Sequence, residues 1–99
     1  MKDAKTIVAE IVQYIKGCGG IFSEWYVGIA SDPTQRLFTD HNVNKGSGHW
    51  IYREAQNSDT ARVIEEHIIE TYKTKGDTGG GDNTTKYVYA YKITSSTRE

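Results

Sequence analysis

The chain of 99 residues contains very little cysteine, proline or methionine, with one residue of each. Because Cys18 is the only cysteine, an internal disulfide and a zinc cage built from cysteines are both excluded. Long apolar runs are also absent: a stretch such as Tyr26 to Ala30 is far shorter than the ~20 residues that a membrane span needs. The start, Met1-Lys2-Asp3, lacks a signal-peptide pattern, so we expect a soluble, cytoplasmic protein.

Neither sign of charge is in excess, since 12 lysines and arginines face 13 acidic residues and give a formal net charge of -1. No basic field of the whole molecule is available for tight non-specific DNA binding, so any contact with nucleic acid needs a local patch. Cationic residues do gather in the middle of the chain: Arg36, His41, Lys45, His49 and Arg53. An acidic block follows: Glu54, Asp59, Glu65, Glu66 and Glu70.

Three helices are expected within a single domain that spans residues 1–99, because this length supports only one core. Apolar residues recur every three or four positions over 3–16, and glycines follow. A second helix is predicted from the cap Asp32 to about Asn42. A third helix is capped by Asn57 or Ser58, and its buried stripe is expected to contain Ala61, Ile64, Ile68 and Tyr72, with Glu65 beside the stripe.

Three strands are expected between and after these helices. They lie at Trp25 to Ile29, at Trp50 to Ala55 and at Lys86 to Thr94, where Tyr87, Tyr89 and Tyr91 alternate onto one face. Residues 73–85 contain four glycines and are predicted to form a flexible loop. The order α-β-α-β-α-β predicts an α+β fold with a small, three-stranded, mainly antiparallel sheet flanked by three helices.

Several short motifs together resemble the GIY-YIG nuclease family. Tyr26-Val27-Gly28 is similar to the family's YIG strand, and Arg36 follows Tyr26 by ten residues in the form Gln35-Arg36-Leu37, with His41 close behind. His49 stands at the start of the next strand. The segment from Ala61 to Ile69 fits the family's A-x-x-x-E-x-x-L-I helix with Glu65 in the glutamate position.

The family's first strand, G-I-Y, is displaced in this chain. Gly20-Ile21-Phe22 precedes Tyr26 by only three intervening residues, which cannot supply both strand length and a turn. The C-terminal run from Tyr89 to Thr94 is instead similar to G-I-Y-K-I-T, with Tyr91 in the first-tyrosine position. We therefore expect a circularly permuted member, covering about Trp25 to Ile93, to which the N-terminal helix is an addition.

The resemblance implies a Mg²⁺-dependent (or Mn²⁺-dependent) endonuclease that hydrolyses DNA. Glu65 would bind the metal, Arg36 would contact the scissile phosphate, and Tyr26 or Tyr91 would position or deprotonate the attacking water. A proton relay is expected at His41 or His49, the side-chain type that titrates near neutrality. Substrate contacts are expected from Lys45, Arg53, Asn83 and Lys86. DNA is the expected partner, together with a partner chain or a second copy.

Each of these residues also has a purely structural interpretation. Strand tyrosines usually pack across a sheet, Arg36 has Asp32 and Asp40 four residues away on its helix, and His49 can be a polar strand end. Glu65 fits such an interpretation least, since a carboxylate beside an apolar stripe needs an arginine, a metal or the edge of the core. The alternative function is therefore a catalytically inactive module of the same fold that binds nucleic acid or a protein.

Overall fold

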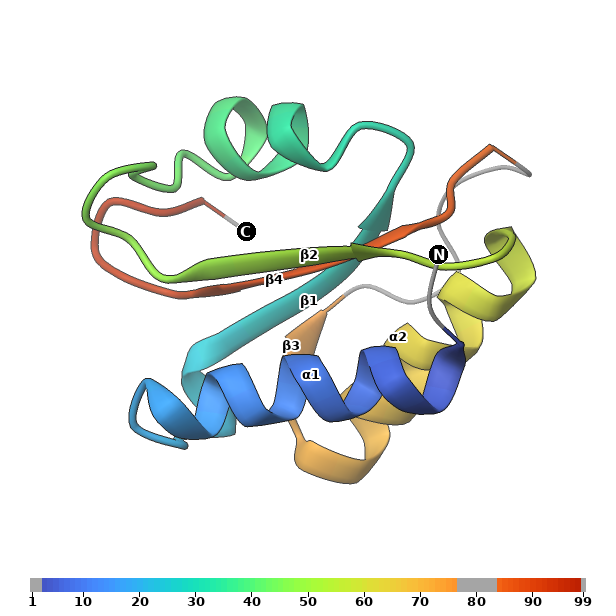
Figure 1. Ribbon diagram of the computed structural model, residues 1–99. Coiled ribbons are helices and arrows are strands. Elements are labelled where there is room, and N and C mark those ends of the chain that lie inside the picture. Colours follow the sequence, from blue (N-terminus) through green and yellow to red (C-terminus); the bar gives the residue numbers. More distant parts are fainter. Residues whose placement is uncertain (1–2, 77–83, 99) are drawn as a thin grey trace.

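The computed structural model describes residues 3–76 and 84–98. Two α-helices pack on one face of a four-stranded sheet, and a short helix covers the other face (Figure 1). The elements are α1 (Ala4–Gly17), η1 (Phe22–Glu24), β1 (Trp25–Ala30), η2 (Gln35–Asp40), β2 (Trp50–Glu54), α2 (Ser58–Tyr72), β3 (Lys75–Gly76) and β4 (Tyr87–Lys92).

The sheet has the order β2-β4-β1-β3, in which β4 runs antiparallel to both of its neighbours and β3 runs parallel to β1. The α+β class is confirmed, but the prediction of three strands is wrong because β3 forms within the stretch expected to be a loop. A two-residue strand leaves no alternation to detect in a sequence. Gly76 is suited to this edge, since a Cβ there would collide with Ile69 and with the carbonyl oxygen of Val27.

Helix α1 lies within one residue of its predicted bounds at each end. The carboxylate of Asp3 accepts a hydrogen bond from the amide of Thr6 at 2.8 Å. At the other end Gly19 and Gly20 adopt φ values of 114° and 75°, and the amide of Gly20 donates to the carbonyl of Ile15. Only glycine enters this left-handed region without strain, so the glycine pair terminates the helix.

Helix α2 is capped by Asn57, whose side chain accepts a hydrogen bond from the amide of Thr60 at 2.8 Å. Lys73 ends the helix in the left-handed conformation with φ 65°. The predicted stripe is buried at its first three positions, whereas Tyr72 is only half-buried and stacks on Phe22 with the ring centroids 4.9 Å apart. Glu65 is buried with the stripe.

Helix η2 is a π-helix, which the sequence did not predict. Asp32 accepts hydrogen bonds from the amide of Gln35 and the hydroxyl of Thr34, as expected of a cap, and the helical residues 33–34 lead into η2. Its end differs: the helix stops at Asp40 instead of continuing to Asn42. The amide of His41 donates to the carbonyl of Arg36, five residues earlier, at 2.8 Å. This wider turn is rare and recurs at functional sites.

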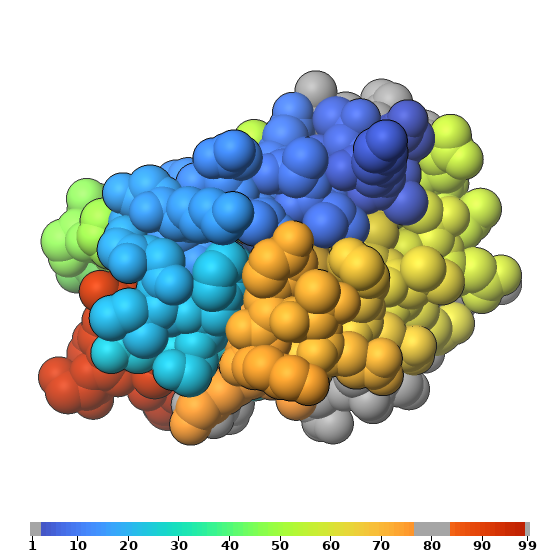
Figure 2. Space-filling model, turned by 90° about the horizontal axis from the view of Figure 1, so that it is seen from below, coloured from blue at the N-terminus to red at the C-terminus, as the bar shows by residue number. Residues whose placement is uncertain are grey.

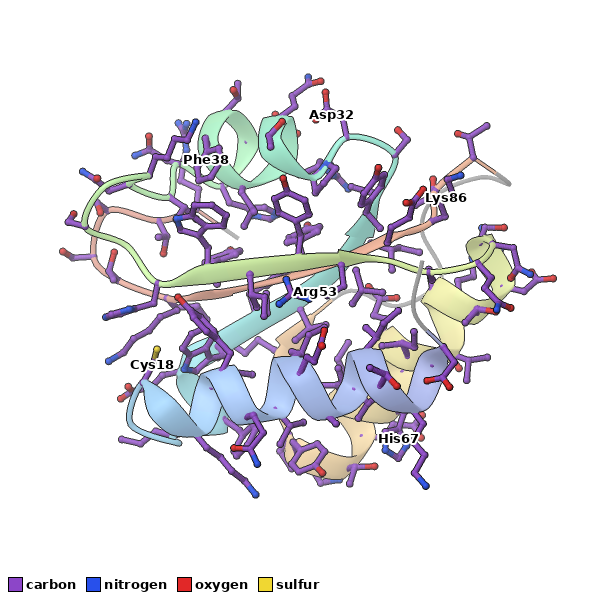
Figure 3. The ribbon with its side chains drawn as sticks, in the orientation of Figure 1. Cys18, Asp32, Phe38, Arg53, His67 and Lys86 are labelled. Atoms are coloured by element: carbon purple, nitrogen blue, oxygen red, sulfur yellow. The ribbon has the colours of Figure 1, made fainter. Side chains whose placement is uncertain are left out.

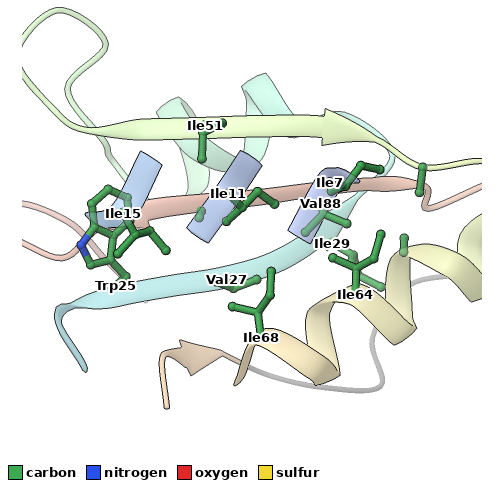
Figure 4. Packing of buried hydrophobic residues seen from close by; sticks show 13 residues of the cluster. Ile7, Ile11, Ile15, Trp25, Val27, Ile29, Ile51, Ile64, Ile68 and Val88 are labelled. Carbon is green, nitrogen blue, oxygen red and sulfur yellow. The ribbon is translucent and has the colours of Figure 1, made fainter. Parts of the chain in front are cut away.

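Alternating strand residues form two apolar layers, one on each face of the sheet. The larger layer packs against α1 and α2 and includes Ile11, Trp25, Val27 and Ile64 (Figure 4). Figure 2 shows α1 and α2 side by side across this face. The smaller layer lies under η2 and consists of Ala30, Leu37, Val43, Tyr89 and Tyr91. None of the helices within 3–76 and 84–98 has the length and apolarity that a bilayer crossing requires.

Candidate active site

Three tyrosines gather on the face of the sheet that η2 covers. Tyr26 of β1 lies directly opposite Tyr91 of β4. Tyr89, two residues before Tyr91 in β4, lies on the same face of the sheet. The ring of Tyr26 stacks against Tyr91 at a centroid distance of 5.3 Å and against Tyr89 at 6.4 Å. Tyr26 is half-buried, whereas Tyr89 and Tyr91 are fully buried. The antiparallel pairing of β1 with β4 therefore brings together two motifs that are far apart in the sequence.

His41 lies among these rings, and only 6% of its surface is exposed. Its Nε2 is 2.7 Å from the hydroxyl of Tyr89, and its Nδ1 is 3.0 Å from the hydroxyl of Tyr91. Nδ1 is also 2.6 Å from the carbonyl oxygen of Arg98. The ring packs against Tyr26 with centroids 4.9 Å apart. Of the two histidines expected as a relay, His41 is the one that this cluster contains.

Burial raises the pKa of the Tyr89 phenol well above its ordinary value of about 10. The neighbouring Tyr26 and the negative charges of Glu65 and Asp40 raise this pKa further, while the positive charge of Arg36 lowers it. Tyr89 therefore keeps its proton at neutral pH and is a hydrogen-bond donor.

A cavity of about 250 Å³ opens beside η2 at the end of β1. Its lining residues are Ile29, Ala30, Ser31, Asp32, Gln35, Arg36, Asp40 and Thr85. The side chain of Arg36 is 52% exposed, and its Nη1 is 3.6 Å from Oδ2 of Asp40. An exposed pair at this distance contributes little to stability, so the guanidinium can exchange its partner for an anion in the cavity.

Glu65 approaches this end of β1 from the opposite face of the sheet. It is carried by α2, is only 1% exposed, and follows Ile64, which lies beside Ile29 in the larger layer (Figure 4). Ile29 also lines the cavity. Strand β3 pairs only with Tyr26 and Val27 of β1. Among the described residues, no strand pairs with this edge of β1 beyond Val27. Glu65 itself is not among the residues that line the cavity.

Four other expected site residues lie away from the tyrosine cluster. His49 is exposed, with Nδ1 3.7 Å from the sulfur of Cys18 at the end of α1. Arg53 points toward α1, where its Nε donates to Glu10 at 2.8 Å (Figure 3). Lys86 forms an ion pair with Glu54 at 3.2 Å, and the Lys45 ammonium lies over the ring of Phe38. Asn83 lies outside the described residues.

Sequence reasoning did not single out two of the groups that contact His41. Tyr89 has a visible signal, because it shares the alternating face with Tyr91, but the motif match directs attention to Tyr91 alone. The carbonyl of Arg98 has no signal at all, since any residue supplies a main-chain oxygen. Its role depends on the path of the last residues, which turn back beneath η2 after β4 (Figure 1) and bring the Arg98 carbonyl to 2.6 Å from Nδ1 of His41.

Glu65 is the residue that would hold a magnesium ion, as the single protein ligand. Among residues 3–76 and 84–98, no group of three or more histidine, cysteine, aspartate or glutamate side chains is placed to hold a metal ion. Mg²⁺ prefers oxygen ligands and keeps several waters, so it is bound through one or two carboxylates together with substrate phosphates. Glu65 supplies a carboxylate of this kind, but it is only 1% exposed and is not among the residues that line the cavity.

Comparison with protein-family models, with curated proteins and with solved structures gave no match. The likeness to GIY-YIG nucleases therefore depends on this chain's own motifs and on how the fold arranges them.

Proposed function

We propose that this protein is a divergent, circularly permuted GIY-YIG-like endonuclease that hydrolyses DNA phosphodiester bonds with Mg²⁺ or Mn²⁺. The observation that supports this most is the buried tyrosine-histidine cluster beneath η2, together with the cavity beside η2. The exposed guanidinium of Arg36 lines that cavity, and Nε2 of His41 lies 2.7 Å from the buried phenol of Tyr89 on the same face of the sheet, while α2 carries the buried carboxylate of Glu65 on the other face.

Arg36 binds the scissile phosphate in this proposal. Its guanidinium is permanently charged, lines the cavity and is released easily from the exposed Asp40. Glu65 would hold the metal ion, whose chemistry there is to neutralise the phosphate charge and to lower the pKa of bound water. Because Asp32 and Asp40 also line the cavity, a phosphate enters only against two neighbouring carboxylates, so binding is expected to be weak and sensitive to salt.

Tyr26 positions the attacking water, because it is the one ring of the three that is partly exposed. The proton that leaves the water passes to the Tyr89-His41 pair: His41 Nε2 accepts the phenol proton while the phenol receives the proton from water. The water oxygen forms the new bond to phosphorus, and the bond to the leaving oxygen breaks with its electron pair. Tyr89 needs no ionisation in this exchange, which agrees with its raised pKa.

Nicking of supercoiled plasmid tests the proposal. The protein with Mg²⁺ should convert plasmid to the open circular form, and chelation of the metal should stop it. Glu65→Ala and Arg36→Ala should abolish nicking while circular dichroism stays native, and His67→Ala, an exposed position on the same helix as Glu65, should nick normally. Undiminished nicking by both site variants, or no nicking by the native chain under varied metal and salt, contradicts the proposal.

A second candidate, a non-catalytic module that binds single-stranded nucleic acid, is favoured by an aromatic strip on the same face. Trp50, Tyr52 and Tyr87 are half-buried, with Trp50 stacked on Tyr52 and Tyr52 edge-on to Tyr87, each pair at 6.1 Å. Partly exposed aromatic rings can stack with unpaired bases. Retention of single-stranded DNA that Trp50→Ala weakens, without any cleavage by the native chain, supports this candidate over the nuclease.

A further inference from the structure

The last residues of the described chain close back onto the tyrosine cluster and form a two-way link with His41. The amide of Arg98 donates to the carbonyl of His41 at 2.7 Å, and the carbonyl of Arg98 lies 2.6 Å from Nδ1 of the same residue. Asn42, the residue after His41, donates from its side-chain amide to the carbonyl of Ser96 at 2.8 Å. The segment Thr94–Arg98 is therefore fastened to the corner that follows η2.

The chemistry of this link fixes the position of a proton. A carbonyl oxygen can only accept, so the short contact with Arg98 requires Nδ1 of His41 to carry hydrogen. In the neutral imidazole the other nitrogen, Nε2, is then a bare acceptor. Nε2 faces the hydroxyl of Tyr89 at 2.7 Å, and that phenol keeps its proton and donates it. The hydroxyl of Tyr91 also donates to the carbonyl oxygen of Arg98, at 3.2 Å, and so occupies the second lone pair of that oxygen.

We propose that the main-chain carbonyl of Arg98 is a positioning group that holds His41 as the Nδ1–H tautomer, so that Nε2 remains available to take a proton from Tyr89. The use of that proton transfer in catalysis rests on the proposed nuclease function; the tautomer itself does not. The side chain of Arg98 has no part in this role. Thr94–Arg98 is thus a component of the site and not a trailing end.

The tautomer is measured directly by long-range ¹H–¹⁵N correlation spectra of the full chain with ¹⁵N-labelled histidine, in which His41→Gln identifies the His41 signals. The native chain should give a protonated Nδ1 and an unprotonated Nε2. Arg98→Ala retains the carbonyl and should leave both signals unchanged. A chain shortened after Ser95 lacks both the Ser96 carbonyl that accepts from Asn42 and the Arg98 carbonyl. In this shortened chain His41 should populate both tautomers.

Residues 94–96 and 98 are exposed and outside both core layers, so the shortened chain should still fold, which its thermal unfolding curve checks. In a cleavage assay the shortened chain should lose about 10- to 100-fold in kcat, with KM nearly unchanged. A loss of this size is the usual effect of removing a group that orients a histidine. A native His41 in the Nε2–H form, or a tautomer unaltered by the shortening, overturns the inference. The predicted tautomer in a chain that never cleaves DNA upholds it and refutes only the nuclease proposal.

Discussion

The phenol of Tyr89 lies over Gly28, its direct partner across the β1–β4 pair, so closely that a Cβ at position 28 would be 2.5 Å from the Tyr89 oxygen. The glycine of the Tyr26-Val27-Gly28 motif is therefore required by a neighbouring ring and not by its backbone angles. This contact brings the hydroxyl of Tyr89 to Nε2 of His41. The site's tyrosine-histidine pair thus depends on the absence of a side chain.

Gly28→Ala should displace Tyr89, because the added methyl group occupies the space of the phenol. We expect a loss of about 1–3 kcal/mol in the free energy of unfolding, typical of overpacking, and loss of the Tyr89–His41 hydrogen bond. Urea unfolding measures the first and histidine NMR the second. Gly17→Ala is the matched control, since nothing lies within 4 Å of a Cβ there, and it should leave stability unchanged or slightly higher. Equal effects of the two substitutions would refute the close contact.

Tyr89→Phe should change how stability responds to alkaline pH. The folded pKa of Tyr89 is raised above its unfolded value, so the unfolded chain ionises first and the folded state loses stability as pH rises above about 10, by up to about 1.4 kcal/mol per pH unit. Urea unfolding at about pH 8 and about pH 11 measures this loss, which Tyr89→Phe should reduce. Tyr52→Phe serves as the comparison and should retain the native slope. A native slope in Tyr89→Phe would show that Tyr89 does not carry the effect.

Glu65→Gln should lower the pKa of Tyr89, because it removes one of the negative charges that raise it. Absorbance titration of tyrosinate, compared between this variant and the same variant carrying Tyr89→Phe, isolates the phenol. Glu66→Gln, one residue along but exposed, should leave the titration unchanged. If Glu65→Gln has no effect, the carboxylate lies too far from Tyr89 to share its site.

Arg53 and Glu10 should behave as a structural pair that joins β2 to α1. A double-mutant cycle with Arg53→Met and Glu10→Gln should give a coupling of about 0.5–1 kcal/mol in the free energy of unfolding, since both side chains are about one-third exposed. A coupling near zero, with weaker DNA binding by Arg53→Met, would favour the substrate contact expected from the sequence.

The sequence allowed most of the elements to be predicted because their signals are local. Asp3, Asp32 and Asn57 each cap a helix through a side chain that accepts a hydrogen bond from the amide three residues along. The alternation of aromatic residues in β4 correctly indicated one shared face for its tyrosines. These features depend on the chain's immediate neighbours and not on the rest of the fold.

What the sequence could not reveal depends on contacts between distant segments. The π-helical turn that precedes His41 and the short strand β3 have no periodic pattern of their own. The motifs indicated which residue types to examine, yet Arg53 joins Glu10 and His49 lies beside Cys18 through packing against α1. The contact of His41 with the Arg98 carbonyl spans 57 residues and involves no side chain of Arg98.

Glu65 and Arg36, which come from opposite faces of the sheet, are proposed to serve one metal-dependent site at the end of β1. Paramagnetic broadening of amide NMR signals by Mn²⁺ examines it directly. We predict that low Mn²⁺ concentrations broaden Ala30, Arg36 and Thr85 first, and that Glu65→Gln abolishes this broadening. Broadening centred elsewhere, or unchanged in Glu65→Gln, would contradict the shared site.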